Sequence, residues 1–185
     1  MGTADQLIAQ GVPEALWKFM RESCHLAFDT FRPLPGAQLP EPARRLLDHA
    51  RDMTSTLAEF HGAPLRVDVL QTRRTEELYL REVFLRTTAT GRLVEYGVLA
   101  VALAQFSAEQ RAAVEAGGAP LGALLHRFQI PFASAPIGFF AATAADIAAT
   151  PLAAHAKGEC YGRLNCLSKP SREPLAWILE ILPPA

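Results

Sequence analysis

The chain contains the run Leu78-Tyr79-Leu80-Arg81-Glu82-Val83-Phe84-Leu85, which has the composition of a buried β-strand but carries charge. Side chains alternate between the two faces of a strand, so Arg81 shares a face with Tyr79, Val83 and Leu85. A buried charge without a partner costs several kcal/mol, so it persists only when it is paired, shifted in pKa or held for a ligand. The run therefore predicts a strand with a guanidinium on its apolar face.

A second apolar run repeats this feature with the opposite charge. In Leu175-Ala176-Trp177-Ile178-Leu179-Glu180-Ile181-Leu182, Glu180 shares a face with Ala176, Ile178 and Leu182. A guanidinium and a carboxyl on apolar faces indicate a site for a small anion that needs proton transfer. The alternative is a structural Arg–Glu pair that closes one edge of a sheet, and the two runs alone leave both interpretations open.

Composition excludes several function classes. A chain of 185 residues is typical of one domain with a substantial core, and we treat residues 1–185 as a single domain. With 18 basic and 19 acidic residues the formal net charge is −1, which offers no basic stripe for nucleic acid. No apolar stretch is long enough to cross a bilayer, so no membrane partner is expected. The N-terminus from Met1 to Gln6 lacks a signal-peptide pattern, which predicts a cytoplasmic location.

The residues that usually bind metals show no suitable spacing. The chain has three cysteines, and an odd number argues against a secreted disulfide framework. Its five histidines contain no pair at helical ligand spacing. We therefore predict no metal site.

The order of the elements predicts an α+β fold. Residues 1–62 are expected to be mainly helical, with helices at about 13–28, 41–52 and 54–61. Residues 63–185 are expected to form an antiparallel β-sheet of about six strands with a helical insertion after Ser107. Helices followed by hairpin-linked strands favour an antiparallel over a parallel sheet.

Local signals predict where elements begin and end. Gly62 suits a left-handed helix C-terminus, with Pro64 just beyond it. Ser107 begins a capped helix, because Gln110 stands at the third position after the cap. Residues 87–91 are expected to form a hairpin loop, and residues 168–174 the turn of a final hairpin.

Four short segments together resemble chorismate lyase, also called chorismate pyruvate-lyase or 4-hydroxybenzoate synthetase. They occur in the family's order and span roughly residues 45–184. The segments are Asp52-Met53-Thr54, Leu80-Arg81-Glu82-Val83, Ala119-Pro120-Leu121-Gly122, and Tyr161-Gly162-Arg163 with the later Ile178-Leu179-Glu180-Ile181-Leu182-Pro183.

The resemblance implies a chorismate-lyase-like domain with helices packed on one side of the sheet, which forms one wall of an enclosed ligand pocket. It also implies conversion of chorismate to 4-hydroxybenzoate and pyruvate without a cofactor, as a step in bacterial biosynthesis or secondary metabolism. The partner is then a small molecule, chorismate or a related carboxylate, and the protein a monomer or small homo-oligomer.

The resemblance also assigns roles to individual residues. Met53, Arg81, Leu121 and Glu180 would contact the ligand, Leu121 through its backbone N–H at a helix start. Arg81 would hold a carboxylate in bidentate fashion, which a lysine could not reproduce. Glu180 would act as the general acid, because a carboxyl in an apolar strand has a raised pKa.

Two further arginines that are common in the family have no counterpart here. By order along the chain their positions correspond to Val98 and to the stretch around Ile137. The pocket is therefore expected to be less cationic and more apolar than in the family. Arg163 is expected either to reach a ligand or to lie exposed on a hairpin, and His126 to have a surface or capping role.

Three functions stay open at this point. The first is chorismate lyase, and the second is the same fold acting on another carboxylated natural-product intermediate. The third is a non-catalytic domain that binds aromatic acids, as in the effector-binding halves of some bacterial transcription regulators. The chain offers no helix-turn-helix and no length for one, which disfavours the third function.

Overall fold

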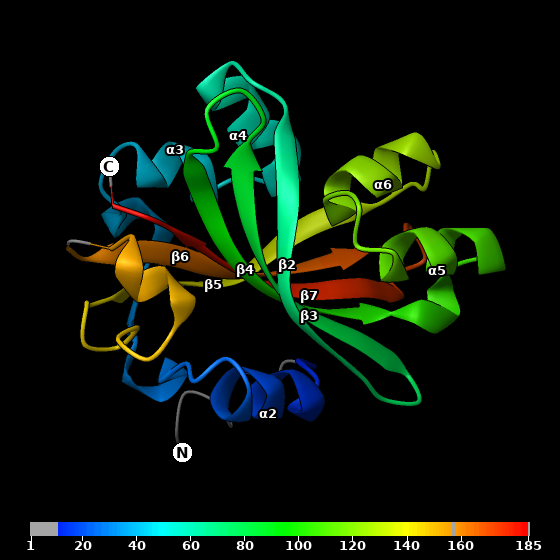
Figure 1. Cartoon of the computed structure of the whole chain (residues 1–185), viewed down its shortest axis with the longest axis horizontal. Helices are drawn as coiled ribbons and strands as arrows, with labels where there is room; N and C mark the ends of the chain where they lie inside the picture. The colour runs from blue at the N-terminus through cyan, green and yellow to red at the C-terminus, as the bar shows by residue number, and fades with distance from the viewer. Residues whose placement is uncertain (1–10, 157, 185) are drawn as a thin grey trace.

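One antiparallel sheet forms the centre of the structure, a computed structural model that describes residues 11–156 and 158–184 (Figure 1). Its seven strands follow the order β1-β5-β6-β7-β4-β3-β2. They are β1 (Arg32–Leu34), β2 (Leu65–Arg74), β3 (Leu78–Thr87), β4 (Leu93–Ala102), β5 (Ala133–Ala142), β6 (Cys160–Ser168) and β7 (Pro174–Leu182). The predicted α+β class with an antiparallel sheet is confirmed.

Beyond the six long strands, the short β1 is an addition that the sequence analysis did not predict. It pairs with β5 at the edge of the sheet, with Pro33 opposite Phe140. A proline cannot donate to a ladder, so it fits an edge strand and not a central one.

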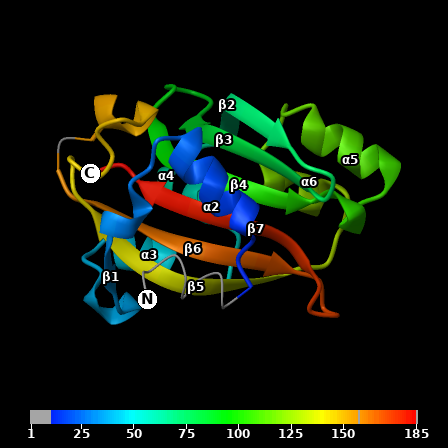
Figure 2. The ribbon, with the colours of Figure 1, turned by 90° about the horizontal axis from the view of Figure 1, so that it is seen from below.

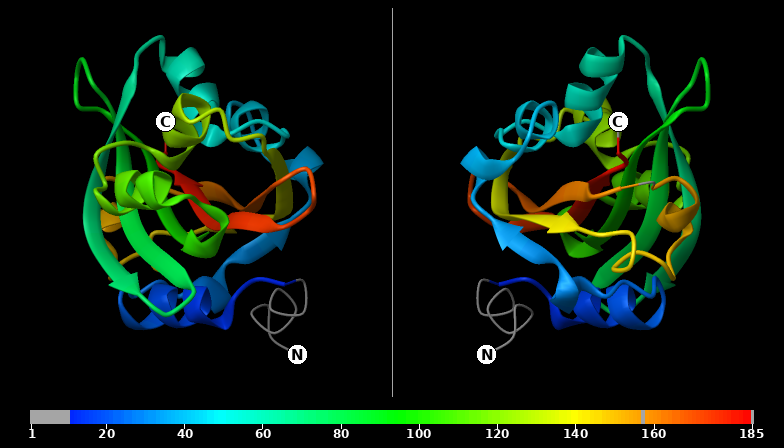
Figure 3. Two further views of the ribbon diagram at one scale, coloured as in Figure 1. Left: turned by 90° about the vertical axis from the view of Figure 1, so that its right-hand side faces the viewer. Right: turned by 90° about the vertical axis from the view of Figure 1, so that its left-hand side faces the viewer.

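Helices cover both faces of the sheet (Figures 2 and 3). The α-helices are α2 (Glu14–Glu22), α3 (Ala43–Leu47), α4 (Met53–His61), α5 (Ala108–Glu115) and α6 (Leu121–Arg127); short 3₁₀ turns are η1 (Phe28–Thr30), η2 (Gly36–Gln38), η3 (Leu103–Gln105) and η4 (Pro151–Ala154). The prediction of helices on one side holds for α3 to α6. Helix α2 lies on the other face, where Leu16, Phe19 and Met20 pack against the sheet.

The first two helices are shorter than predicted. Helix α2 ends at Glu22, and His25 has a φ of 54°, outside the right-handed helical region. The helix expected over 41–52 is reduced to α3, Ala43–Leu47. The loop between α3 and α4 is therefore irregular backbone whose polar groups need partners outside a helix.

Alternation along the central strands decides which side chains face α3 to α6. On β3 the odd-numbered residues from Tyr79 to Leu85 pack with the clusters around those helices. The even-numbered residues Leu80 and Phe84 pack with α2. Register aligns Val83, Gly97, Glu180 and Arg163 in one row across β3, β4, β7 and β6. This row lies on the face of α3 to α6 and positions the site described below.

The predicted element ends are confirmed at Gly62 and Ser107. Gly62 ends α4 with a φ of 60°, in the left-handed region. Ser107 caps α5 in a reciprocal arrangement with Gln110. The cytoplasmic location was predicted from Met1 to Gln6, and these residues lie outside the described ranges. No helix in the described ranges has the length and apolar character needed to span a membrane.

Replacing Gly62 by alanine tests the left-handed helix end. We expect Gly62→Ala to lower the free energy of unfolding by about 1 kcal/mol, because an L-residue side chain is strained at that φ. Urea unfolding measures the change. Gly118→Ala is the control, since Gly118 lies outside the left-handed region and has open space around an added Cβ. Equal effects of the two substitutions would contradict this account.

Candidate functional site

A cavity lies between the sheet and the first turns of α4 and α6. The strand residues that line it are Val67, Arg81, Val83, Leu85, Glu95, Gly97, Leu99, Leu167, Ile178 and Glu180, and the residues at the helix starts are Asp52, Met53, Thr54, Pro120, Leu121 and Gly122. The empty space between these atoms is about 480 Å³, and about 40 Å³ can hold the centre of a water-sized sphere. The cavity is therefore narrow, and it brings together Met53, Arg81, Leu121 and Glu180.

Arg81 is buried in the cavity wall without a protein partner for two of its nitrogens. The residue is 1% exposed, and neither Nε nor Nη1 has a hydrogen-bond partner. Burial lowers the pKa of its guanidinium, yet an arginine keeps its charge in proteins. A buried cation whose N–H donors lack a protein partner is suited to bind an anion such as a carboxylate.

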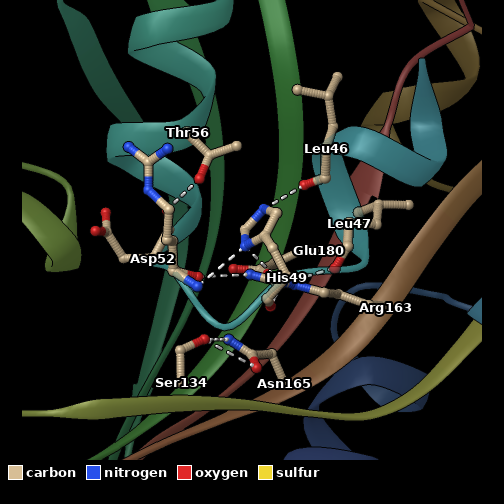
Figure 4. Close-up of polar contacts among 10 residues, drawn as sticks. Leu46, Leu47, His49, Asp52, Thr56, Ser134, Arg163, Asn165 and Glu180 are labelled. Atoms are coloured by element: carbon tan, nitrogen blue, oxygen red, sulfur yellow. Dashed lines mark hydrogen bonds and ion pairs between the residues drawn. The ribbon is translucent and has the colours of Figure 1, made fainter. Parts of the chain in front are cut away.

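Glu180 is paired with Arg163, which is fully buried and not exposed on the hairpin (Figure 4). Arg163 Nε donates to Glu180 Oε2. Arg163 Nη1 donates to the backbone oxygens of Leu47 at 2.8 Å and His49 at 3.0 Å. Burial raises the pKa of Glu180, and the Arg163 cation opposes that rise. The ion pair thus joins the sheet to the loop before α4.

A third charged residue of the cavity, Glu95, was missed in the sequence analysis. It is 3% exposed, and its Oε2 has no hydrogen-bond partner. Burial raises the pKa of Glu95 well above its ordinary value, and the nearby Glu180 carboxyl adds to the rise. The signal was present, because Glu95 interrupts the apolar run Leu93–Ala102 as Arg81 interrupts β3.

Not every charge inside a strand belongs to the cavity. Glu82 is also buried, but it lies on the face of α2, where it accepts hydrogen bonds from Tyr96 Oη and Gln71 Nε2. Both donors come from neighbouring strands, so Glu82 is satisfied within the protein.

The interpretation of Val98 and Ile137 as lost arginine positions of the pocket is wrong for this structure. Val98 belongs to the core on the α2 face, and Ile137 packs against the same core. Neither residue lines the cavity. The residues of β4 that line it are Glu95, Gly97 and Leu99.

The starts of α4 and α6 meet at Asp52. Asp52 Oδ1 accepts from Ser55 N at 2.8 Å, and His126 Nε2 lies 3.0 Å from Asp52 Oδ2. Burial acts to raise the pKa of Asp52, but these hydrogen bonds outweigh it and the pKa is lowered. Gly122 allows the approach, since a Cβ there would lie 2.6 Å from Asp52 Oδ1. The side chain of His126 is largely exposed, in agreement with the surface role expected of it.

A roomier hollow elsewhere is chemically less suited to bind an anion. It lies beside α3, α4 and the end of β7, and about 380 Å³ can hold the centre of a water-sized sphere. Its carboxylates already have partners, since Glu41 pairs with Arg44 and Glu159 with Arg32. The cavity with Arg81 combines burial and unpaired donors, so it is the candidate site.

Comparison with known proteins shows the fold but no family. No family model matches the sequence, and no curated protein is similar to it. Among solved structures, the gene product SA0254 from Staphylococcus aureus matches with a TM-score of 0.51 and 8% identity, covering 74% of this chain and 90% of that chain. PhnF from Mycobacterium smegmatis matches with a TM-score of 0.51 and 15% identity, covering 71% of this chain and 63% of that chain.

A third match is the ligand-binding domain of a Bordetella bronchiseptica protein assigned to the GntR family of transcriptional regulators. Its TM-score is 0.44 and its identity 14%, covering 65% of this chain and 83% of that chain. The likeness to SA0254 and PhnF, at identities this low, concerns the fold alone. The chain has the chorismate-lyase-like α+β fold that the sequence motifs implied.

Breaking the buried ion pair tests how much it stabilises the fold. We expect Arg163→Met to lower the free energy of unfolding by about 3–5 kcal/mol, because it leaves the Glu180 charge buried and unpaired. Urea unfolding at neutral pH provides the measurement. The double variant Arg163→Met/Glu180→Leu should recover part of the loss, since no buried charge remains. Both variants lose the backbone contacts of Arg163, so a double variant no more stable than the single one would show that the unpaired Glu180 charge is not the cause of the loss.

Proposed function

We propose that this chain is a carbon–oxygen lyase that eliminates pyruvate from chorismate to give 4-hydroxybenzoate. The observation that carries the proposal is the buried Arg81, with two unpaired N–H donors in a cavity that also contains buried carboxyls. The motif resemblance around Asp52, Arg81, Leu121 and Glu180 supports the choice of chorismate. The proposal treats residues 1–185 as one domain.

The reaction needs one group that binds an anion and groups that move two protons. The bond between a ring carbon and the ether oxygen breaks, and the oxygen leaves with the electron pair and takes up a proton. A ring C–H on the neighbouring carbon loses its proton, and its electron pair completes the aromatic ring. The released enolpyruvate becomes pyruvate. No oxidant or reductant is required, and aromatisation supplies the thermodynamic drive.

The residues of the cavity have the chemical properties for these steps. Arg81 would bind a substrate carboxylate through the N–H donors that have no protein partner. Glu180 would take part in proton transfer, since its pKa is raised by burial. Met53 would cover the ring. Leu121 begins α6, and the first N–H groups of a helix have no partner within it, so its N–H could donate to a substrate oxygen.

A ring-sized substrate requires the cavity to open, because the space for a water-sized sphere is small. The start of α4 and helix α6 are the parts that would separate, since Asp52 before α4 and His126 in the last turn of α6 join them at a partly exposed contact. Closure over the substrate would then exclude water and strengthen the contacts of Arg81.

A second candidate function is supported by the number of cations. Among the described residues that line the cavity, Arg81 is the only arginine or lysine. One cation suits a ligand with one carboxylate, such as an aromatic acid, whereas chorismate carries two. The alternative is therefore an aromatic-acid-binding domain, or an enzyme acting on a monocarboxylate.

Turnover of chorismate is the direct test. We expect the purified protein to release 4-hydroxybenzoate and pyruvate in equal amounts, measured by chromatography. Glu180→Gln should lower kcat/KM by about 10²–10⁴-fold through loss of proton transfer, and Arg81→Gln should raise KM through loss of the carboxylate contact. Arg66→Gln is the matched control, because Arg66 is exposed on β2.

The outcomes separate the two candidate functions. Absence of both products would exclude the lyase. Binding of 4-hydroxybenzoate that depends on Arg81, without turnover of chorismate, would support the second candidate. Wild-type rates in both cavity variants would contradict the assignment of the site.

A further inference from the structure

Two carboxyls, those of Glu95 and Glu180, occupy the same wall of the cavity. Gly97 lies directly opposite Glu180 in the ladder, and Glu95 is two residues before Gly97, on the same face of β4. A Cβ at position 97 would lie 3.2 Å from Glu95 Oε1. The absence of a side chain at Gly97 therefore leaves the Glu95 carboxyl room to lie over the strand beside Glu180.

The two carboxyls have unequal partners. Glu180 Oε2 accepts from Arg163, whereas Glu95 Oε2 has no hydrogen-bond partner. Two carboxylates that are neighbours on one buried cavity wall cannot both ionise at low cost, so one of them holds a proton. The carboxyl in contact with a cation is the better place for the negative charge.

The other charged groups around Glu95 also favour the placement of the proton on Glu95. Asp52 approaches from α4 and Glu180 from β7, and both raise the pKa of Glu95. Arg163 from β6 lowers it, but its N–H groups are engaged by Glu180 and the loop before α4. Arg81 on β3 lines the same cavity and makes no hydrogen bond to Glu95. Burial is the largest cause of the raised pKa.

We propose that Glu95 is the proton donor of this cavity and that Glu180, held ionised by Arg163, is the proton acceptor. The family resemblance assigned the donor role to Glu180, and Glu95 was not among the candidates. The assignment of the resident proton rests on the burial and the contacts of the two carboxyls, with the raised pKa of Glu95 as support, while its use in catalysis rests on the proposed lyase function.

In the proposed elimination, the proton that Glu95 donates is balanced by the proton that Glu180 accepts. The Glu95 carboxyl gives its proton to the departing ether oxygen and becomes a carboxylate. The Glu180 carboxylate takes the proton from the ring carbon and becomes a carboxyl. One proton transfer from Glu180 back to Glu95 restores the starting state, with no external acid or base consumed.

Infrared spectroscopy can locate the resident proton without any ligand. At pH 7 the wild-type protein should show a C=O stretching band of a protonated, buried carboxylic acid, which shifts in D₂O. We expect Glu95→Gln to abolish this band and Glu180→Gln to retain it. Loss of the band in Glu180→Gln, with retention in Glu95→Gln, would overturn the proposal, and so would absence of the band in wild type.

The pH dependence of stability provides a second, independent measurement. A carboxyl whose folded pKa lies above its unfolded value of about 4.3 contributes stability at low pH that is lost as the pH rises through the folded pKa. Glu95→Gln removes this loss of stability. The unfolding midpoint of Glu95→Gln minus that of the wild type should therefore increase from pH 4 to pH 7. A difference that is constant or falls over this range would contradict the proposal.

Turnover separates failure of this proposal from failure of the lyase function. If chorismate is converted, Glu95→Gln should lower kcat about 10²–10⁴-fold with little change in the binding of 4-hydroxybenzoate. Conversion at the wild-type rate in Glu95→Gln would overturn the donor role and leave the lyase function intact. No conversion by the wild type, with the infrared band assigned to Glu95, would exclude the lyase and leave the proton assignment standing.

Discussion

The ion pair between Arg163 and Glu180 connects the parts of the molecule that form the cavity. Arg163 lies on β6 and Glu180 on β7, directly opposite each other in the ladder. The same guanidinium donates to the carbonyl of Leu47, the last residue of α3, and to that of His49, in the loop that leads on to α4. This loop has no regular structure of its own, so the buried arginine satisfies backbone oxygens that would otherwise lack partners. The start of α4, with Asp52 and Met53, is positioned as a consequence.

The three ionisable side chains that the strands place on the cavity wall differ in how their burial is compensated. Glu180 has a cation in contact, whereas Arg81 and Glu95 each keep atoms without a partner. Unpaired buried groups of this kind destabilise a fold, and they are found mainly where a ligand or a reaction uses them. The contrast with Glu82 is informative, since that carboxyl is equally buried and fully satisfied by Tyr96 and Gln71. Among the described residues, the buried charged side chains that keep unpartnered atoms, Arg81 and Glu95, both lie on the face of the sheet that α4 and α6 cover.

The fold by itself does not choose between catalysis and binding. SA0254 and PhnF share the architecture at 8% and 15% identity, a level at which side chains in the cavity have no reason to be the same. What distinguishes this chain is the set of residues on β3, β4 and β7 that face α4 and α6. A single unpaired guanidinium beside two carboxyls suits the recognition of an anion coupled to proton transfer. The function must accordingly be argued from these side chains.

Alternation in the sequence was sufficient to place Arg81 and Glu180 on apolar strand faces, and local signals were sufficient for the helix end at Gly62 and the cap at Ser107. These features depend on neighbours along the chain, which a sequence contains. The burial of Arg163, its pairing with Glu180 and the position of Glu95 beside Glu180 were decided by the register of β4, β6 and β7, because strand pairing joins residues far apart in the sequence. Tertiary structure also decided that α2 covers the opposite face, since an amphipathic helix has an apolar side but carries no information about which side of a sheet will receive it.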